Sequence, residues 1–377
     1  MEGRLAGAAL ERFGLGDAAL EPLRLGRSFT QVLHVTTKRG ERFALKLYTP
    51  PPPDGGGPPG DVRAAGERLT ASQLRSPKVL ASQLRWLLEF GRDTDFLVPE
   101  PVPLPDGSPL GRVSSHDLSP RGTQEMSSRS FCLLRWVPGA HEPGGRLTNR
   151  DAALVGSYLA RLHGHAETHG VPEGAAFPHW DWGWPFGPSA PLWSQGPSFY
   201  SEGEMETFRT AARLVRGDLE RLGHGPGIFG VVHRDPKLEN LVFEGGRVGA
   251  VDFDMSGLGH YMLDVRVFRA SLEFRYPDRL EALWAAFLRG YEAERALPED
   301  HHRYLRTFAV MQRMAAVNRR LGLLGSGGGR GILKNTVPWL EGLSKRWGTH
   351  AGAWLPYPLG GLFPEELSWA AGVLALL

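Results

Sequence analysis

Alternating apolar and polar positions dominate the first part of the chain and predict β-strands there. Residues 32–37 and 42–48 alternate in this way, and the turn at Gly40 predicts that they form a hairpin. A third apolar run, residues 131–137, predicts a buried strand that ends at Pro138. The pattern therefore predicts a strand-rich first part.

Lys46 occupies a defined position within the second of these strands. Side chains of a strand alternate between its two faces, so we expect Lys46 to share a face with Ala44 and Tyr48. The opposite face is apolar and comprises Phe43, Leu45 and Leu47. Lys46 thus projects beside a small alanine, on a face with room for a flat base and its phosphates.

Helical periodicity replaces strand alternation later in the chain. Ser76-Pro77 is typical of a helix start, and leucines spaced three and four residues apart follow it. After residue 150 the helical period dominates. His163 and His165 fall at the end of the first such helix, and we interpret them as structural residues rather than metal ligands.

The stretch from residue 231 to residue 254 concentrates polar side chains that could take part in catalysis or metal binding. Two β-prone runs flank Gly245-Gly246, which predicts a hairpin. Pairing outward from that turn brings Asn240 close to Asp252 at the open end. An amide oxygen and a carboxylate suit a hard cation such as Mg2+, which prefers oxygen ligands.

Asp235 lies on the loop that enters this hairpin, five residues before Asn240, where it could reach an attacking hydroxyl. Phosphoryl transfer needs such an acceptor-orienting group together with a cation that neutralises developing charge. A surface hairpin with ordinary acidic tips is the alternative interpretation. The apolar residues Val231, Val232 and Val251 instead favour buried strands that deliver polar ends.

The pattern H-x-D-x-x-x-x-N followed by V-D-F-D resembles the aminoglycoside phosphotransferase and choline kinase family. Further matching segments follow in the family's order: ALKLY from Ala44, WLLEF through VPEPVPLPDG from Trp86, LLRWVPG from Leu133, GSYLARLHGHA from Gly156 and LGHYMLDV from Leu258. The resemblance implies an α+β, two-lobed protein-kinase-like fold. Its small antiparallel-sheet lobe would span residues 1–137, with a Pro/Gly-rich insertion at 49–60, and its larger, mostly helical catalytic and acceptor-binding lobe residues 138–377.

The resemblance also implies roles for individual residues. Asp235 would be the catalytic base, His233 would support its loop, and Asp264 would anchor that loop. The remaining implied residues bind ATP (Lys46, Ser28, Gln83 and the backbone of Arg135, Trp136 and Val137) or Mg2+ (Asn240, Asp252 and, as a second ligand or a brace, Asp254). Simple packing is the alternative role for Trp136.

Two residues depart from the pattern of the family. Gln83 stands where the family usually has a glutamate that pairs with the strand lysine; it could accept a hydrogen bond from Lys46 but brings no charge. This favours a weakly active, nucleotide-binding pseudokinase as one alternative. Lys237, two positions after Asp235, makes HRDPKLEN similar to a protein-kinase motif and places positive charge near the transferring phosphate. It favours a stress-response type of protein serine/threonine kinase as another.

Composition and charge narrow the partners. The chain has 377 residues, 43 basic and 41 acidic, and Cys132 as its only cysteine, so we expect a cytoplasmic protein without disulfides. No apolar run is long enough to cross a bilayer, and no nucleic-acid motif accompanies the basic residues. We therefore expect ATP and a hydroxyl-bearing small molecule as partners, with a protein acceptor left open.

Basic residues are concentrated between positions 301 and 350, a stretch that contains nine Lys/Arg and a single acidic residue, Glu341. Such a surface would repel a polycationic aminoglycoside, which argues against that class of acceptor. Arg306, Arg313 and Arg320 recur every seven residues, so a solvated helix face is an equally good interpretation as an anion-binding pocket.

Overall fold

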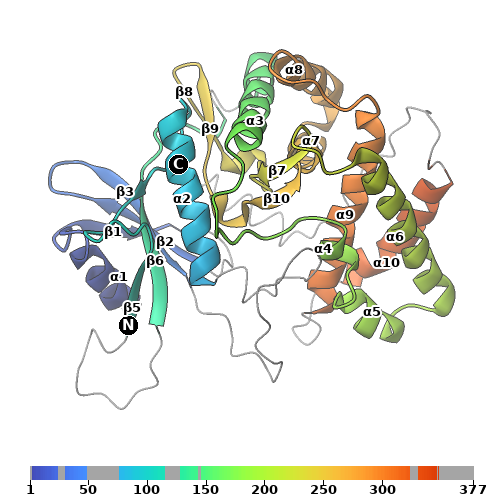
Figure 1. Cartoon of the computed structure of the whole chain (residues 1–377), viewed down its shortest axis with the longest axis horizontal. Coiled ribbons are helices and arrows are strands. Elements are labelled where there is room, and N and C mark those ends of the chain that lie inside the picture. Colours follow the sequence, from blue (N-terminus) through green and yellow to red (C-terminus); the bar gives the residue numbers. More distant parts are fainter. Residues whose placement is uncertain are drawn as a thin grey trace.

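The computed structural model describes residues 2–23, 30–48, 76–114, 128–142, 146–322, 330–345 and 347. Its first lobe is built on an antiparallel sheet of six strands (Figure 1). The order along the sheet is β1 (Ala19–Pro22), β2 (Thr30–Thr36), β3 (Arg42–Tyr48), β6 (Ser128–Arg135) and β4 (Pro101–Val102), with β5 (Gly111–Ser114) also paired to β6. The predicted hairpin around Gly40 is confirmed, since β2 pairs with β3.

Each face of this sheet is covered by one helix. The apolar face of β3 packs with Leu5 and Leu10 of α1 (Glu2–Glu11). The other face, which carries Tyr48, packs with Leu80 and Leu84 of α2 (Pro77–Asp93). The alternation predicted for β3 is therefore confirmed.

Helix α2 begins where the sequence predicted. Ser76 is its N-cap, its hydroxyl accepts a hydrogen bond from the N–H of Val79 at 3.3 Å, and Pro77 occupies the first turn. Further along α2, Trp86, Leu87 and Phe90 belong to the large core of the second lobe. Figure 1 accordingly shows α2 between the sheet and the helices of that lobe. One helix thus contacts both lobes.

The second lobe is mostly helical, as predicted. Its helices are α3 (Asn149–His169), α4 (Gly183–Phe186), α5 (Pro191–Gln195), α6 (Glu202–Leu222), α7 (Met262–Arg275), α8 (Leu280–Glu292), α9 (His301–Leu321) and α10 (Arg330–Ser344). The described part of this lobe also contains two short antiparallel ribbons: β7 (Phe229–Val232) with β10 (Gly257–His260), and β8 (Leu241–Glu244) with β9 (Arg247–Ala250). The backbones of helices α3 and α8 are in direct contact. This close approach requires glycine at position 156, because a Cβ there would overlap the carbonyl of Phe287.

Three predicted features lie outside the described residues. They are Ser28, the insertion at 49–60 and the chain beyond residue 347. Among the helices that are described, none is both long and apolar enough to traverse a membrane.

Candidate active site

The ribbon of β8 and β9 delivers the polar residues that the sequence placed at its open end. Gly245 and Gly246 form the turn with φ of 57° and 77°, a left-handed conformation that glycine adopts without steric cost. At the other end, the N–H of Val251 donates to the carbonyl of Asn240 at 2.8 Å, which extends the pairing by one residue. The predicted hairpin is confirmed, and Asp252 follows directly after it.

Lys46 from β3 meets two carboxylates at this end of the ribbon. Its Nζ lies 2.7 Å from Oδ1 of Asp252 and 2.9 Å from Oδ1 of Asp254. Burial would lower the pKa of Lys46, but the two carboxylates outweigh it and raise that pKa above its usual value. Burial raises the pKa of Asp254 against the attraction of Lys46, whereas Lys46 keeps the pKa of Asp252 low despite burial. The lysine therefore stays charged and Asp252 stays ionised.

Asp252 adopts a left-handed backbone conformation, with φ of 64° and ψ of 58°. Such a conformation is uncommon outside glycine and concentrates at functional sites. The Asp252 side chain is 42% exposed, so a cation could reach its oxygens from solvent. Asn240 donates hydrogen bonds through Nδ2, which leaves its amide oxygen available as a second hard ligand for a cation. The donor set of carboxylate and amide oxygens fits Mg2+.

A buried carboxylate anchors the loop that carries Asp235. Asp264 is fully buried and accepts hydrogen bonds from the N–H groups of His233 at 2.8 Å and Arg234 at 2.7 Å. His163 of α3 approaches the same carboxylate with Nε2 at 3.2 Å. The His233 ring connects the loop to the end of the β8–β9 ribbon. Its Nε2 lies 3.1 Å from the carbonyl of Val251, and its Nδ1 accepts a hydrogen bond from the N–H of Asp235 at 3.3 Å.

Asp235 lies beside both residues that the sequence grouped with it. The Nδ2 of Asn240 donates to Oδ2 of Asp235 at 2.9 Å and to its backbone carbonyl at 2.8 Å. The Nζ of Lys237 lies 2.8 Å from the same Oδ2. Burial raises the pKa of Asp252 and Lys46 lowers it; Lys237 lowers it further, with a smaller effect. The loop and the ribbon thus share one electrostatic environment.

Gln83 contacts the site differently from the prediction. Its Nε2 donates to the carbonyls of Asp254 at 3.1 Å and Ser256 at 2.8 Å, and its Oε1 has no hydrogen-bond partner among the described residues. The expected hydrogen bond from Lys46 to Gln83 is therefore wrong. Two carboxylates already hold the lysine, and the uncharged amide can donate to backbone oxygens where a carboxylate could not.

The segment between the lobes has fewer free donors than expected for adenine. The N–H of Arg135 donates to the carbonyl of Glu100 at 2.8 Å, and the N–H of Trp136 donates to that of Arg42 at 3.1 Å. Of the three predicted residues, only Val137 could offer its N–H to a base. The Trp136 ring packs 4.6 Å from the His34 ring, which supports the packing role for its side chain.

Arg234 is a site residue that the sequence reasoning missed. Its guanidinium lies 4.2 Å from the Trp184 ring centroid and 5.1 Å from that of Trp180, both from the tract Pro178–Pro188 that precedes α5. Burial lowers the pKa of Arg234 to about 10, so it remains charged at neutral pH. The aromatic tract had only its composition as a signal, and the sequence alone could not reveal its contact with a residue at least fifty positions later.

Two arginines of the basic stretch of α9 bind other residues within the protein. Arg313 is fully buried, and its Nε donates to Oγ1 of Thr336 at 2.9 Å. Arg303 is paired with the buried carboxylate of Asp218, with Nε 2.6 Å from Oδ1. The interpretation as a solvated face is wrong for Arg313, because α10 covers that part of α9.

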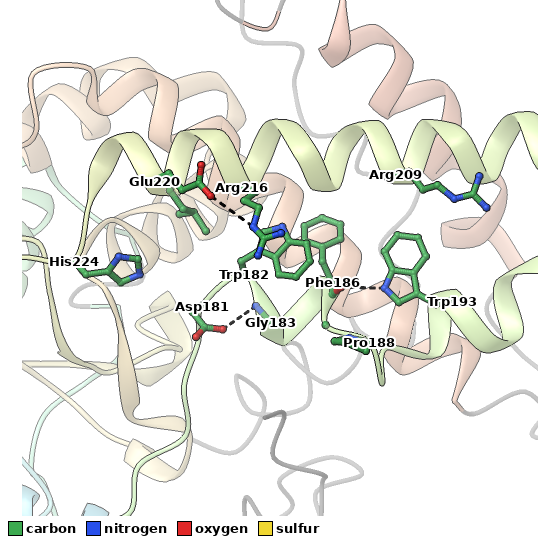
Figure 2. Close-up of a pocket in the computed structure, with 12 residues that line it drawn as sticks. Asp181, Trp182, Gly183, Phe186, Pro188, Trp193, Arg209, Arg216, Glu220 and His224 are labelled. Atoms are coloured by element: carbon green, nitrogen blue, oxygen red, sulfur yellow. Dashed lines mark hydrogen bonds and ion pairs between the residues drawn. The ribbon is translucent and has the colours of Figure 1, made fainter. Parts of the chain in front are cut away.

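A separate open cavity of about 860 Å³ lies between α4 and α6 (Figure 2). Arg216 lies over the Trp182 ring at 4.5 Å, and Asp181 accepts from the N–H of Gly183 at 2.8 Å. Figure 2 also shows Glu220 beside Arg216. None of the predicted catalytic or nucleotide-binding residues that the structure describes lines this cavity. It therefore belongs to the wall of the second lobe rather than to the catalytic cluster.

The chain belongs to the phosphotransferase enzyme family, whose model matches residues 19–304. It is accordingly a phosphotransferase, and the family and fold predicted from the motifs are confirmed. No curated protein sequence matches significantly.

Several solved structures share the fold. The microcompartment-associated aminopropanol kinase is 23% identical, with a TM-score of 0.64, 91% of this chain and 97% of its own covered. An amicoumacin kinase solved with AMP-PNP and Ca2+ is 14% identical, with a TM-score of 0.64 and coverage of 92% and 96%. A macrolide 2'-phosphotransferase from Brachybacterium faecium is 17% identical, with a TM-score of 0.52 and coverage of 90% and 98%.

Proposed function

We propose that this phosphotransferase moves the γ-phosphate of ATP to a hydroxyl group of a small molecule, with Asp235 as the catalytic base. The observation that carries the proposal is the convergence of two clusters. Asp235, Lys237 and Asn240 are joined by contacts of 2.8–2.9 Å, and Lys46 joins Asp252 and Asp254 at similar distances. An acceptor-orienting carboxylate beside a phosphate-binding lysine is what phosphoryl transfer requires.

The residues divide the work by their chemistry. Lys46 neutralises phosphate charge, and Asp235 orients the acceptor hydroxyl and takes its proton. The new O–P bond forms as the bond from the γ-phosphorus to the bridging oxygen breaks, and ADP leaves. Asn240 holds Asp235 in position through two hydrogen bonds. Lys237 adds positive charge beside the transferring group. Mg2+, held by Asn240 and Asp252 and with Asp254 as a further ligand or brace, would neutralise the phosphate oxygens when bound.

The positive charge beside Asp235 favours an acceptor other than a polycation. Arg234 immediately precedes Asp235 and is positively charged, so it would repel an ammonium-rich acceptor bound next to Asp235. The basic stretch of α9 contributes less to this argument than its sequence implied, because Arg313 is buried and Arg303 is neutralised. The named neighbours act on aminopropanol, amicoumacin and macrolides, which supports a small-molecule alcohol as the acceptor class here.

A protein serine/threonine acceptor is the second candidate, and Lys237 favours it. Its Nζ sits 2.8 Å from the carboxylate of Asp235, where it could contact both the phosphate and a bound peptide segment. Transfer of labelled phosphate from ATP to proteins of a lysate, set against transfer to a panel of sugars, amino alcohols and macrolides, separates the two acceptor classes.

The base is tested by Asp235→Ala with ADP release as the assay. We expect turnover to fall by about 10³-fold, since general base catalysis contributes on that order, while ATP affinity changes only a few-fold. Asp278→Ala, which removes an exposed carboxylate in the second lobe, is the matched control and should keep wild-type turnover. Unchanged turnover in Asp235→Ala would refute the role. Binding of ATP by the wild type with no ADP release on any acceptor would favour the pseudokinase alternative.

A further inference from the structure

A second cluster of potential cation ligands lies outside the site described above. Asp93 is the last residue of α2, and His165 and His169 lie one turn apart at the end of α3. One ligand atom from each residue lies within 4.8 Å of those from the other two. The sequence reasoning dismissed His165 for want of a partner, but His169 is four positions later, and Asp93 comes from another helix.

The hydrogen bonding of His169 fixes which of its nitrogens faces the cluster. Its Nδ1 lies 3.1 Å from the carbonyl oxygen of His165, an acceptor, so Nδ1 carries the proton. In the neutral ring Nε2 then presents a lone pair, and it lies 3.5 Å from Oδ2 of Asp93. Two lone pairs facing each other repel unless a cation lies between them. The backbone bond at Nδ1 is also the arrangement that orients metal-binding histidines in proteins.

His165 turns the same edge toward the same oxygen. Its Nε2 lies 3.0 Å from Oδ2 of Asp93, and its ring stacks on that of His169 with centroids 4.0 Å apart. Edge contacts with Trp86 and Phe90 of α2 hold the ring in place, and the side chain is only 5% exposed. This ligand is therefore ordered before any ion binds.

Two of the three distances between ligand atoms match a compact coordination sphere, and the third lies within 4.8 Å. Metal–nitrogen and metal–oxygen bonds of about 2.1 Å in a tetrahedron separate neighbouring ligand atoms by about 3.4 Å. The two contacts to Asp93, at 3.0 and 3.5 Å, bracket this value. In addition, α2 and α3 both end here, so the negative ends of two helix dipoles face the cluster and favour positive charge.

We propose that Asp93, His165 and His169 form a binding site for a divalent transition metal of the zinc class, distinct from the phosphate-binding centre. Two imidazoles and one carboxylate select such ions over Mg2+, which prefers oxygen ligands alone. Exposure of Asp93 and His169 leaves the remaining coordination positions to water.

Metal at this site ties together the two helices that hold the catalytic centre. Helix α2 carries Gln83, which binds the backbone at Asp254 and Ser256. Helix α3 carries His163, which binds Asp264 beneath the loop of Asp235. The link therefore restrains α2 against the second lobe. The inference does not depend on the identity of the acceptor or on the role of Asp235.

The experiment is a titration of tag-free full-length protein with Co2+, followed by visible absorption at pH 7.5. The titration is carried out in the Asp252→Asn background, so that the phosphate-binding centre contributes no signal. We expect one equivalent to bind with the absorption of a nitrogen-containing site, and Zn2+ to displace it.

Two ligand variants and one control decide the outcome. His169→Ala removes a half-exposed ligand, and Asp93→Asn preserves shape, so both should fold; each should weaken Co2+ binding at least tenfold. His302→Ala removes an exposed histidine of α9 and should bind as the parent does. No stoichiometric band in the parent, or equal affinity in parent and both ligand variants, overturns the proposal and leaves a protonated histidine–aspartate pair as the explanation of the cluster.

Discussion

The loop side and the strand side of the candidate active site are held in different ways. On the loop side, a fully buried carboxylate, Asp264, accepts two backbone N–H bonds at 2.7–2.8 Å and lies 3.2 Å from His163. On the strand side, Lys46 forms ion pairs with Asp252 and Asp254, whose side chains are 42% and 26% exposed. The first arrangement is closed to solvent, whereas the second faces it.

This difference indicates how the site is prepared for its ligands. The loop that carries Asp235 is positioned by the protein alone, so the proposed base would need little rearrangement before reaction. In the proposed function, a nucleotide and its cation bind at the ion pairs of Lys46, and we expect the lysine to exchange a carboxylate for phosphate. Loss of an anchor should therefore affect stability on the loop side and mainly catalysis on the strand side.

The largest effect should follow from Asp264→Ala. It leaves the N–H groups of His233 and Arg234 without their acceptor inside the protein. We expect the free energy of unfolding to fall by about 2–5 kcal/mol, because each buried donor left without a partner costs about 1–3 kcal/mol. Urea unfolding measures this loss, with Asp278→Ala as the control within about 0.5 kcal/mol of wild type. A loss below 1 kcal/mol in Asp264→Ala would contradict the anchoring role.

A smaller effect, confined to catalysis, should follow from Lys46→Met. Removing one preorganised charge from the phosphates should lower kcat/KM for ATP by about 10²-fold. Lys38→Met is a matched control, because Lys38 is an exposed lysine paired with Asp17 in the turn before β3. It should leave kcat/KM unchanged. Equal activities of the two variants would remove Lys46 from the nucleotide site.

The smallest effect concerns pH and again distinguishes the two sides. Burial lowers the pKa of His163 below its usual 6.5 despite the nearby Asp264. Its contribution to stability is therefore present above pH 6.5 and is lost as the pH falls below that value. Lys46 has a raised pKa and contributes no change in this range.

The measurement is urea unfolding of wild type and His163→Gln from pH 8 to pH 5. The stability advantage of the wild type should shrink as the pH falls. Burial also lowers the pKa of His260, to about 4, but that histidine is present in both proteins and cancels in the difference. A difference that stays constant with pH would show that His163 is not a buried neutral group.

Local sequence signals predicted the parts of the fold that depend on neighbours along the chain. The glycine pair of the β8–β9 turn, the Ser76 cap of α2 and the alternation of β3 each encode their own conformation, and all three are confirmed. The grouping of Asn240 with Asp235 was also predictable, because the two residues are only five positions apart in the sequence. These features depend on turn, cap and period, which a single segment contains.

Contacts between distant segments could not be predicted in this way. Gln83 was assigned to Lys46, yet it binds backbone carbonyls more than 170 positions later. Arg313 looked like a surface residue because seven-residue spacing does not reveal that α10 covers it. The contact of Arg234 with Trp184 and that of His165 with Asp93 have the same origin, since each joins elements that only tertiary packing brings together.

The most direct test of the central claim is anomalous diffraction from crystals grown with Mn2+ and AMP-PNP. Mn2+ replaces Mg2+ at oxygen ligands and can be located by its own scattering. The account predicts a peak in contact with the Asp252 carboxylate and the Asn240 amide oxygen, with the terminal phosphate next to Asp235. A nucleotide-bound ion that contacts neither residue, or a terminal phosphate remote from Asp235, would contradict it.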